Sequence, residues 1–146
     1  MNPQACEEYL RQWFDRLWNQ GDLAAADTLC RKQVVLHFPE WQHLIGVQGY
    51  KDYVTFARNL FPNLHVHIQE MVIEGDHVAV RYSWVGTYAG GQTPLGVGRS
   101  GAEVAMQGIA IYHLVENQIA VGWAIEDWLS VYQQLGIVSA REAQAA

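Results

Sequence analysis

The spacing of the apolar residues changes partway along this chain, and that change constrains the fold more than any other feature. Up to about residue 61 they recur every three or four positions, as on one face of a helix. From about residue 64 the chain is rich in Val, Ile, Tyr and Trp that partly alternate with polar residues, which is typical of strands. Helices first and strands second predict an α+β fold rather than a doubly wound parallel sheet.

Helix-capping and turn residues mark the ends of the expected helices and strands. We expect helices at residues 3–20, from Asp22 through LAAADTLC, and at 49–61, with a short strand at 34–38 between the last two. Four long strands should follow at 64–74, 77–89, 103–115 and 118–126, and a last helix should follow Asp127 and end at Gly136.

The length of the chain, 146 residues, fits one domain, and no repeat or linker divides it. We assign residues 1–138 to this single domain. The polar, Ala-rich residues 139–146 are expected to form a flexible tail.

The charge of the chain argues against two classes of partner. Nine Lys and Arg against fifteen Asp and Glu give a net charge of -6. This is the wrong sign for a phosphate backbone or an anionic bilayer, so we expect neither a nucleic acid nor a membrane partner. No signal-like start and no run of about 18 apolar residues occurs, which favours a cytoplasmic protein.

Metal-ligand and nucleotide motifs are weak in this sequence. Cys6 and Cys30 lack zinc spacing, and His65 and His67 have no third ligand at a suitable distance along the chain, so no metal site is expected. Residues 96–101 fit GxGxxG, but the strand, turn and helix that this motif needs are missing. We interpret the Gly-rich stretch as a flexible loop at the mouth of a cavity.

The turn at residues 116–117 decides the register of the last hairpin. A two-residue turn would pair Val115 with Gln118, whereas a three-residue turn would place Val115 opposite Ile119. The second register gathers bulky residues on one face and small residues on the other, so we favour it on packing grounds.

The register also decides which candidate residues lie together. In the favoured register Gln107 and His113 share a face with Trp123 and Asp127. In the other register His113 lies on the opposite face.

Five segments between about residues 19 and 136 resemble, in order and spacing, the SnoaL-like polyketide (ester) cyclase family: NQGDLAAADTL, VVLHFP, GVQGYKDYVTFARNLFPNL, EGDHVAVRYSWVGTYAG and QGIAIYHLVENQIAVGWAIEDWLSVYQQLG. The most specific part is the spacing of Trp123, Asp127 and the Gln-Leu-Gly at 134–136. The chain departs from the family pattern at residues 117–119 and at Val121, where the family usually has a Gly-Lys-Ile turn and a Glu.

The resemblance implies a cone-shaped fold like that of nuclear transport factor 2, in which a curved antiparallel sheet wraps around helices. It also implies ring closure of a polyketide ester by an intramolecular aldol reaction that needs no metal or organic cofactor. Asp127 matches the position of the acid/base Asp in this family.

Two interpretations of Asp127 stand side by side. An aldol cyclisation needs a proton removed from carbon and another delivered to oxygen, and one carboxyl in a dry setting against Trp123 and Trp128 can do both. Asp is also among the best helix N-caps, and Asp127 directly precedes a helix.

The other candidate residues would surround the substrate. His113 is the second catalytic candidate, as an imidazole that polarises a carbonyl, although a sheet-edge histidine facing water fits its position equally well. We expect substrate contacts from Gln107, Trp123, Trp84, His37 and Tyr53, with Tyr82 as a further aromatic wall and Arg81 in an outer-face salt bridge.

The sequence thus predicts a cofactor-independent cyclase that acts on a small hydrophobic or aromatic keto ester. A hydrolase or isomerase with the same pocket, or a non-catalytic carrier of a lipophilic molecule, is the alternative. A homodimer is expected because the outer face of a single curved sheet needs cover.

Overall fold

The computed structural model describes residues 1–39 and 44–139. Its helices are α1 (Pro3–Gln12), the π-helical η1 (Trp13–Asn19), α2 (Ala25–Leu29), α3 (Gly46–Leu60) and α4 (Trp128–Gln134). Its strands are β1 (Cys30–His37), β2 (Leu44–Ile45), β3 (His65–Glu74), β4 (His77–Thr87), β5 (Glu103–Val115) and β6 (Gln118–Glu126).

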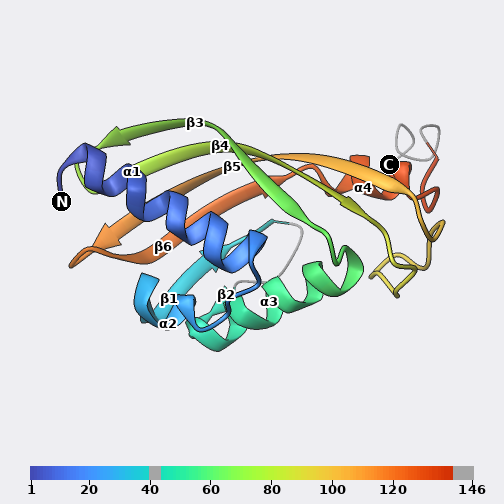
Figure 1. Cartoon of the computed structure of the whole chain (residues 1–146), viewed down its shortest axis with the longest axis horizontal. Coiled ribbons are helices and arrows are strands. Elements are labelled where there is room, and N and C mark those ends of the chain that lie inside the picture. The colour runs from blue at the N-terminus through green and yellow to red at the C-terminus, as the bar shows by residue number, and fades with distance from the viewer. Residues whose placement is uncertain (40–43, 140–146) are drawn as a thin grey trace.

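The strands form one six-stranded sheet in the order β2-β1-β6-β5-β4-β3. Neighbouring strands are antiparallel except β1 and β6, which are parallel. Figure 1 shows α1, α2 and α3 on one side of the sheet, while α4 continues from the end of β6. The predicted α+β class is confirmed; β2 was not predicted, and β1 begins four residues earlier than the apolar run that predicted it.

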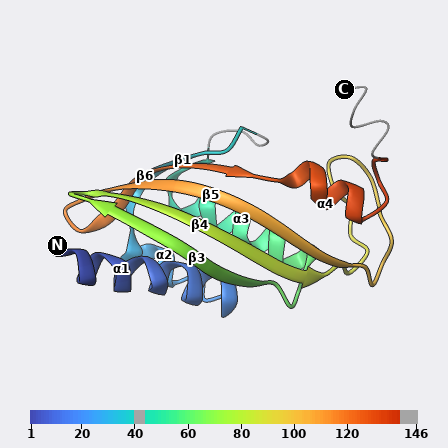
Figure 2. The ribbon, with the colours of Figure 1, turned by 90° about the horizontal axis from the view of Figure 1, so that it is seen from above.

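The long strands run between two distinct ends of the molecule. The β3–β4 and β5–β6 turns lie at one end, beside the N-terminus, and α4 lies at the other (Figure 2). Residues at the start of β4 and the end of β5 are therefore far from those at the junction of β6 and α4.

Side chains alternate strictly between the two faces of β4 and β5, and the inner face packs against the helices. Small residues lie on this inner face because large side chains already fill it. A Cβ added at Gly122 would lie 2.5 Å from Leu36 Cδ2, and one added at Gly108 would lie 2.7 Å from the ring of Tyr82. The large apolar residues Ile109, Ile111, Trp123 and Ile125 point outward and are exposed.

The last hairpin combines parts of both predicted registers. Glu116 and Asn117 both have positive φ angles, of 50° and 63°, and Val115 pairs with Gln118, as in a two-residue turn. A register shift then follows, so that His113 pairs with Val121. The predicted three-residue turn is wrong. The bulge next to the turn shifts the pairing by one residue, however, so His113 lies on the same face as Trp123, as predicted.

The Gly-rich stretch packs against the C-terminal end of α4 and the residues that follow it, Leu135 and Ile137. The Arg99 N–H donates to the carbonyl of Leu135, and a Cβ at Gly98 would lie 2.7 Å from Leu135 Cβ. Part of the expected tail, residues 140–146, lies outside the described residues. Within the described ranges no helix is both long and apolar enough to cross a bilayer.

Candidate active site

A buried carboxyl group lies on the inner face of the sheet, at the last residue of β6. Glu126 is only 6% exposed. Its two oxygens accept hydrogen bonds from the phenols of Tyr53 on α3, at 2.6 Å, and Tyr82 on β4, at 2.9 Å. These charge-assisted hydrogen bonds offset the desolvation of the carboxylate, because each supplies a donor that water would otherwise provide.

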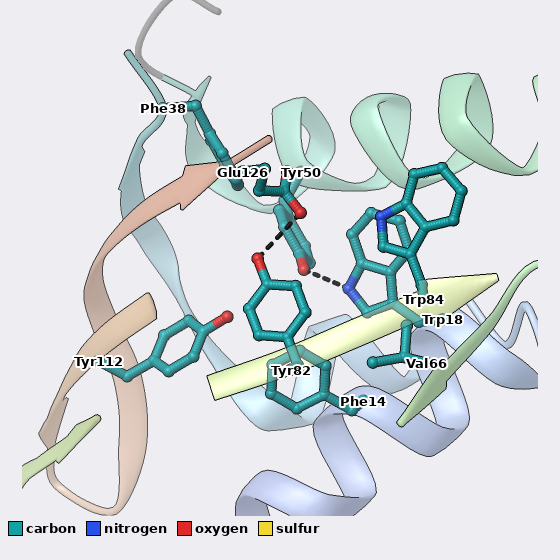
Figure 3. Close-up of a pocket in the computed structure, with 9 residues that line it drawn as sticks. All are labelled: Phe14, Trp18, Phe38, Tyr50, Val66, Tyr82, Trp84, Tyr112 and Glu126. Carbon is teal, nitrogen blue, oxygen red and sulfur yellow. Dashed lines mark hydrogen bonds between the residues drawn. The ribbon is translucent and has the colours of Figure 1, made fainter. Parts of the chain in front are cut away.

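Aromatic rings surround this carboxyl on the inner side of the sheet (Figure 3). The other residues that line the space are Phe14, Trp18, Phe38, Tyr50, Val66, Trp84 and Tyr112. Trp18 donates its indole N–H to the Tyr50 hydroxyl at 2.7 Å, so part of this wall is itself hydrogen-bonded. The rings leave a space of about one water molecule.

The electrostatics of this site keep its phenols protonated. Burial, and to a smaller extent the neighbouring Glu126 carboxylate, raises the pKa of Tyr53 and that of Tyr82 well above the ordinary value. Both tyrosines therefore remain donors at neutral pH. A carboxyl that can exchange a proton, beside two phenols that can stabilise an oxyanion, is suited to proton transfer at carbon next to a carbonyl.

A second, much larger concavity lies on the outer face of the sheet. It measures about 900 Å³ and its wall is mostly apolar. Ile109, Trp123 and Ile125 line it and are 55%, 47% and 67% exposed. His37 stacks on Trp123, with ring centroids 5.6 Å apart.

Asp127 borders this outer groove and caps α4. Its side chain accepts a hydrogen bond from the Ser130 N–H at 3.1 Å, and its own N–H donates to the carbonyl of Gln107 at 3.0 Å. The side chain is exposed, and Trp128 points inward, away from it. The capping role is confirmed, and the acid/base role stays a prediction.

The sheet separates the predicted site residues into three groups. Asp127, Gln107, Trp123 and His37 line the outer groove, as does the exposed Arg81. Tyr53 and Trp84 lie on the inner side, with Glu126, which also borders the outer groove. The sequence placed these two groups around one pocket because it assigned the face that carries Asp127 and Trp123 to the substrate pocket.

His113 belongs to neither group. It shares the outer face with Gln107, as expected, but it lies six residues farther along β5, roughly 20 Å away at the usual rise of a strand. Its Nε2 lies 2.9 Å from a carboxylate oxygen of Asp76. Hydrogen bonds from His113 and His77 lower the pKa of Asp76. The predicted pairing of His113 with Asp127 is thus ruled out by distance in this structure.

Glu126 was not predicted from the sequence, although the sequence carries a signal for it. Glu126 has the same parity along β6 as Gly122 and Ala124, and these small residues indicate a crowded side of the sheet. A charged residue on the crowded side is unusual, because carboxylates are seldom buried without partners. Tyr53 and Tyr82, which serve as those partners, were predicted only as aromatic walls.

The comparisons with known proteins agree on one family. The model of the SnoaL-like polyketide cyclase family matches residues 8–135. No curated protein matches the chain.

Solved structures extend this agreement to the whole fold. A candidate polyketide cyclase from Acidithiobacillus ferrooxidans is 30% identical, with 100% of both chains covered and a TM-score of 0.79. A candidate SnoaL-like polyketide cyclase from a Jannaschia species is 19% identical, with 92% of this chain and 95% of that one covered and a TM-score of 0.81. IdmH, a candidate polyketide cyclase from Streptomyces antibioticus, is 23% identical, with 90% and 98% covered and a TM-score of 0.75.

The family match spans most of the chain, and the six-stranded curved sheet with its helices on one side is the fold of these relatives. The chain therefore belongs to the SnoaL-like polyketide cyclase family.

Proposed function

We propose that this protein closes a ring in a polyketide-like keto ester by an intramolecular aldol reaction, with Glu126 as the acid/base. Membership of the family supports a cyclase-type role. The observation that carries the finer proposal is the burial of Glu126 between the phenols of Tyr53 and Tyr82. Among the residues that the structure describes, Glu126 is the one acidic side chain that is buried, and two phenols donate hydrogen bonds to it.

The proposed chemistry needs two proton transfers and one new bond. The Glu126 carboxylate removes a proton from the carbon between two carbonyl groups, and the resulting enolate carbon attacks a ketone carbon in the same molecule. The ketone oxygen becomes an alkoxide and takes the proton back from the Glu126 carboxylic acid. Tyr53 and Tyr82 stabilise negative charge on oxygen during these steps. Substrate and product have the same mass.

Substrate entry requires the inner aromatic side chains to move. The space beside Glu126 is about the size of one water molecule, too small for a keto ester. The rings of Phe14, Phe38 and Tyr112 line this space and would have to change rotamer on binding. The water-sized space also favours hydrolysis as a second candidate function, because a water held there would lie beside a general base.

Asp127 is the second candidate for the acid/base in the cyclase reaction. Two observations favour it: its position matches the Asp of the family pattern, and the apolar groove of about 900 Å³ beside it has room for a keto ester. Its exposed side chain lacks the dry surroundings that would activate it.

One pair of variants distinguishes the two carboxyls. Wild type, Glu126→Gln and Asp127→Asn are each incubated with a panel of aromatic and aliphatic β-keto esters, and chromatography with mass spectrometry detects ring-closed products of unchanged mass. We expect Glu126→Gln to lose on the order of 10²- to 10⁴-fold in rate, as for a lost general acid/base, and Asp127→Asn to stay near wild type. Both changes keep size, and Asn caps a helix about as well as Asp.

Loss of activity in Asp127→Asn, with activity retained in Glu126→Gln, would assign the acid/base role to Asp127. Products heavier by one water would indicate hydrolysis. A wild type that binds these esters, quenches its tryptophan fluorescence and leaves them unchanged would contradict the cyclase proposal and favour a carrier.

We also propose that the outer face forms the contact of a homodimer. Ile109, Ile111, Trp123 and Ile125 expose large apolar surfaces next to one another on β5 and β6, where Ile109 pairs with Ile125 and Ile111 with Trp123. A contiguous apolar patch of this kind is typical of a protein–protein contact. A second copy would bury these side chains and the outer groove with them.

A further inference from the structure

Two histidines and an aspartate meet at the end of the sheet that is remote from Glu126. The tight turn after β3 carries Asp76, the next residue, His77, begins β4, and β4 pairs with β5 so that His77 lies directly opposite His113. Among the described residues they form the one group of three side chains whose potential metal-ligand atoms all lie within 4.8 Å of one another.

The carboxylate of Asp76 already contacts both imidazoles. His77 Nδ1 lies 2.7 Å from one oxygen, and His113 Nε2 lies 2.9 Å from the other. The two rings are stacked, with centroids 4.5 Å apart and planes 10° apart. The nitrogen atoms thus face a common point beside the carboxylate, although each ring has to tilt before both lone pairs can point at one ion.

The backbone holds these three residues in place. The Leu114 N–H donates to the carbonyl of Asp76 at 2.9 Å, which fastens the turn to β5 beside His113. The cross-strand pairing of His77 and His113 fixes the distance between their Cα atoms. The side chains are 52%, 30% and 61% exposed for His77, His113 and Asp76, so the rings have room to tilt and an ion has access.

We propose that Asp76, His77 and His113 bind a divalent transition-metal ion, with water completing its coordination. Two imidazole nitrogens and one carboxylate oxygen suit Zn²⁺, Co²⁺, Ni²⁺ or Cu²⁺, whereas Mg²⁺ and Ca²⁺ prefer oxygen ligands alone. On binding, the metal takes the place of the proton on the ring nitrogen that faces Asp76, and a neutral imidazole then carries its proton on the other ring nitrogen, exchanged through solvent. The ion would join the β3–β4 turn to β5.

Sequence spacing did not reveal this group because its members come from different strands. His77 and His113 are brought together by the pairing of β4 with β5, and neither belongs to a short motif. His65 and His67, whose spacing did suggest a ligand pair, have rings 4.6 Å apart but belong to no such group in the described part of the chain. They provide a matched control.

Calorimetric titration of the tag-free protein with Zn²⁺ tests the proposal, and visible absorption of added Co²⁺ reports nitrogen ligation. We expect one saturable equivalent per chain for wild type. His77→Asn and His113→Asn should each weaken Zn²⁺ binding by on the order of tenfold or more, since even supporting residues of metal sites cost this much. The double variant His65→Asn/His67→Asn and the Glu126→Gln variant should bind Zn²⁺ like wild type.

Three results would overturn the site. They are no saturable Zn²⁺ binding by wild type, an unchanged affinity in His113→Asn, and an equal loss in the His65→Asn/His67→Asn control. Circular dichroism and melting temperature without metal check that the exposed substitutions leave the fold intact. Mg²⁺, titrated in the same way, should show no binding at the group.

Discussion

Two neighbouring carboxyl groups lie in opposite settings where β6 meets α4. Glu126 points inward, is buried and accepts hydrogen bonds from two phenols, whereas Asp127 points outward, is exposed and caps a helix. The residues before them differ in the same way, with Gly122 and Ala124 on the inside and Trp123 and Ile125 on the outside. Adjacent acids of almost equal chemistry thus have different surroundings because they lie on opposite sides of the sheet.

If the outer face is the contact of a homodimer, a charge introduced there by substitution should have the largest effect, because the dimer would have to bury it. Ile125→Asp places a carboxylate in the centre of the proposed contact, and we expect it to convert a dimeric wild type to a monomer. Light scattering after size-exclusion chromatography measures the mass of both proteins. Val72→Asp is the control, because Val72 is also exposed at 60% but lies on β3, at the far edge of the sheet. A monomeric wild type would show that the outer face is open to solvent or to a ligand.

The inner face should respond most strongly to added volume. Gly122→Val introduces a Cβ 2.5 Å from Leu36 Cδ2 and crowds Tyr112, so we expect the free energy of unfolding to fall by about 1–3 kcal/mol or more. Ala105→Val makes a comparable change on the exposed side of β5 and should alter stability by no more than about 0.5 kcal/mol. Urea denaturation followed by tryptophan fluorescence gives both values. Equal effects of the two substitutions would contradict the assignment of the inner face as the crowded one.

The fold of this chain was predictable because it follows from repeated patterns. The change of hydrophobic spacing near residue 61 gave the α+β class, and turn residues such as Gly75-Asp76 and Glu116-Asn117 gave the hairpins. A pattern summed over many residues tolerates local errors, so the missed β2 and the early start of β1 did not change the outcome.

The site was harder to predict because alternation defines two faces and does not say which is inside. The sequence placed Trp123 and Gln107 in the substrate pocket because the favoured register puts them on the same face as Asp127. In this chain rings from the helices, such as Phe14, supply much of the inner bulk, and β5 and β6 carry the small residues Gly108 and Gly122 beneath it. Which face the helices cover is a property of the tertiary structure, and the assignment of Glu126 and Asp127 depends on it.

High pH should destabilise the protein through its inner face. Burial is the main cause that raises the pKa of Tyr50, Tyr53, Tyr82 and Tyr112 above the ordinary value of 10.0. Well below pH 10 these phenols are protonated in both folded and unfolded chains, so the free energy of unfolding does not depend on them. Above it the unfolded chain loses protons that the folded chain keeps, and stability falls as pH rises, by up to about 1.4 kcal/mol per pH unit for each such tyrosine.

Phenolate absorbance, followed together with circular dichroism, checks this expectation. The phenolate absorbance of Tyr50, Tyr53, Tyr82 and Tyr112 should rise only as the protein unfolds. Titration of all seven tyrosines near pH 10, with the fold retained, would contradict the closed inner face.

The smallest expected effect belongs to Asp127, because an exposed cap contributes little. Asp127→Ala removes the acceptor of the Ser130 N–H and should lower the free energy of unfolding by about 1 kcal/mol, whereas Asp127→Asn should change it by only a few tenths. Urea denaturation measures both, and the keto ester assay is run on the same samples. If Asp127 is only a cap, activity should persist in both variants under conditions in which each remains folded. Loss of activity in Asp127→Asn without loss of stability would assign the chemistry to the outer face and make the buried Glu126 a structural residue.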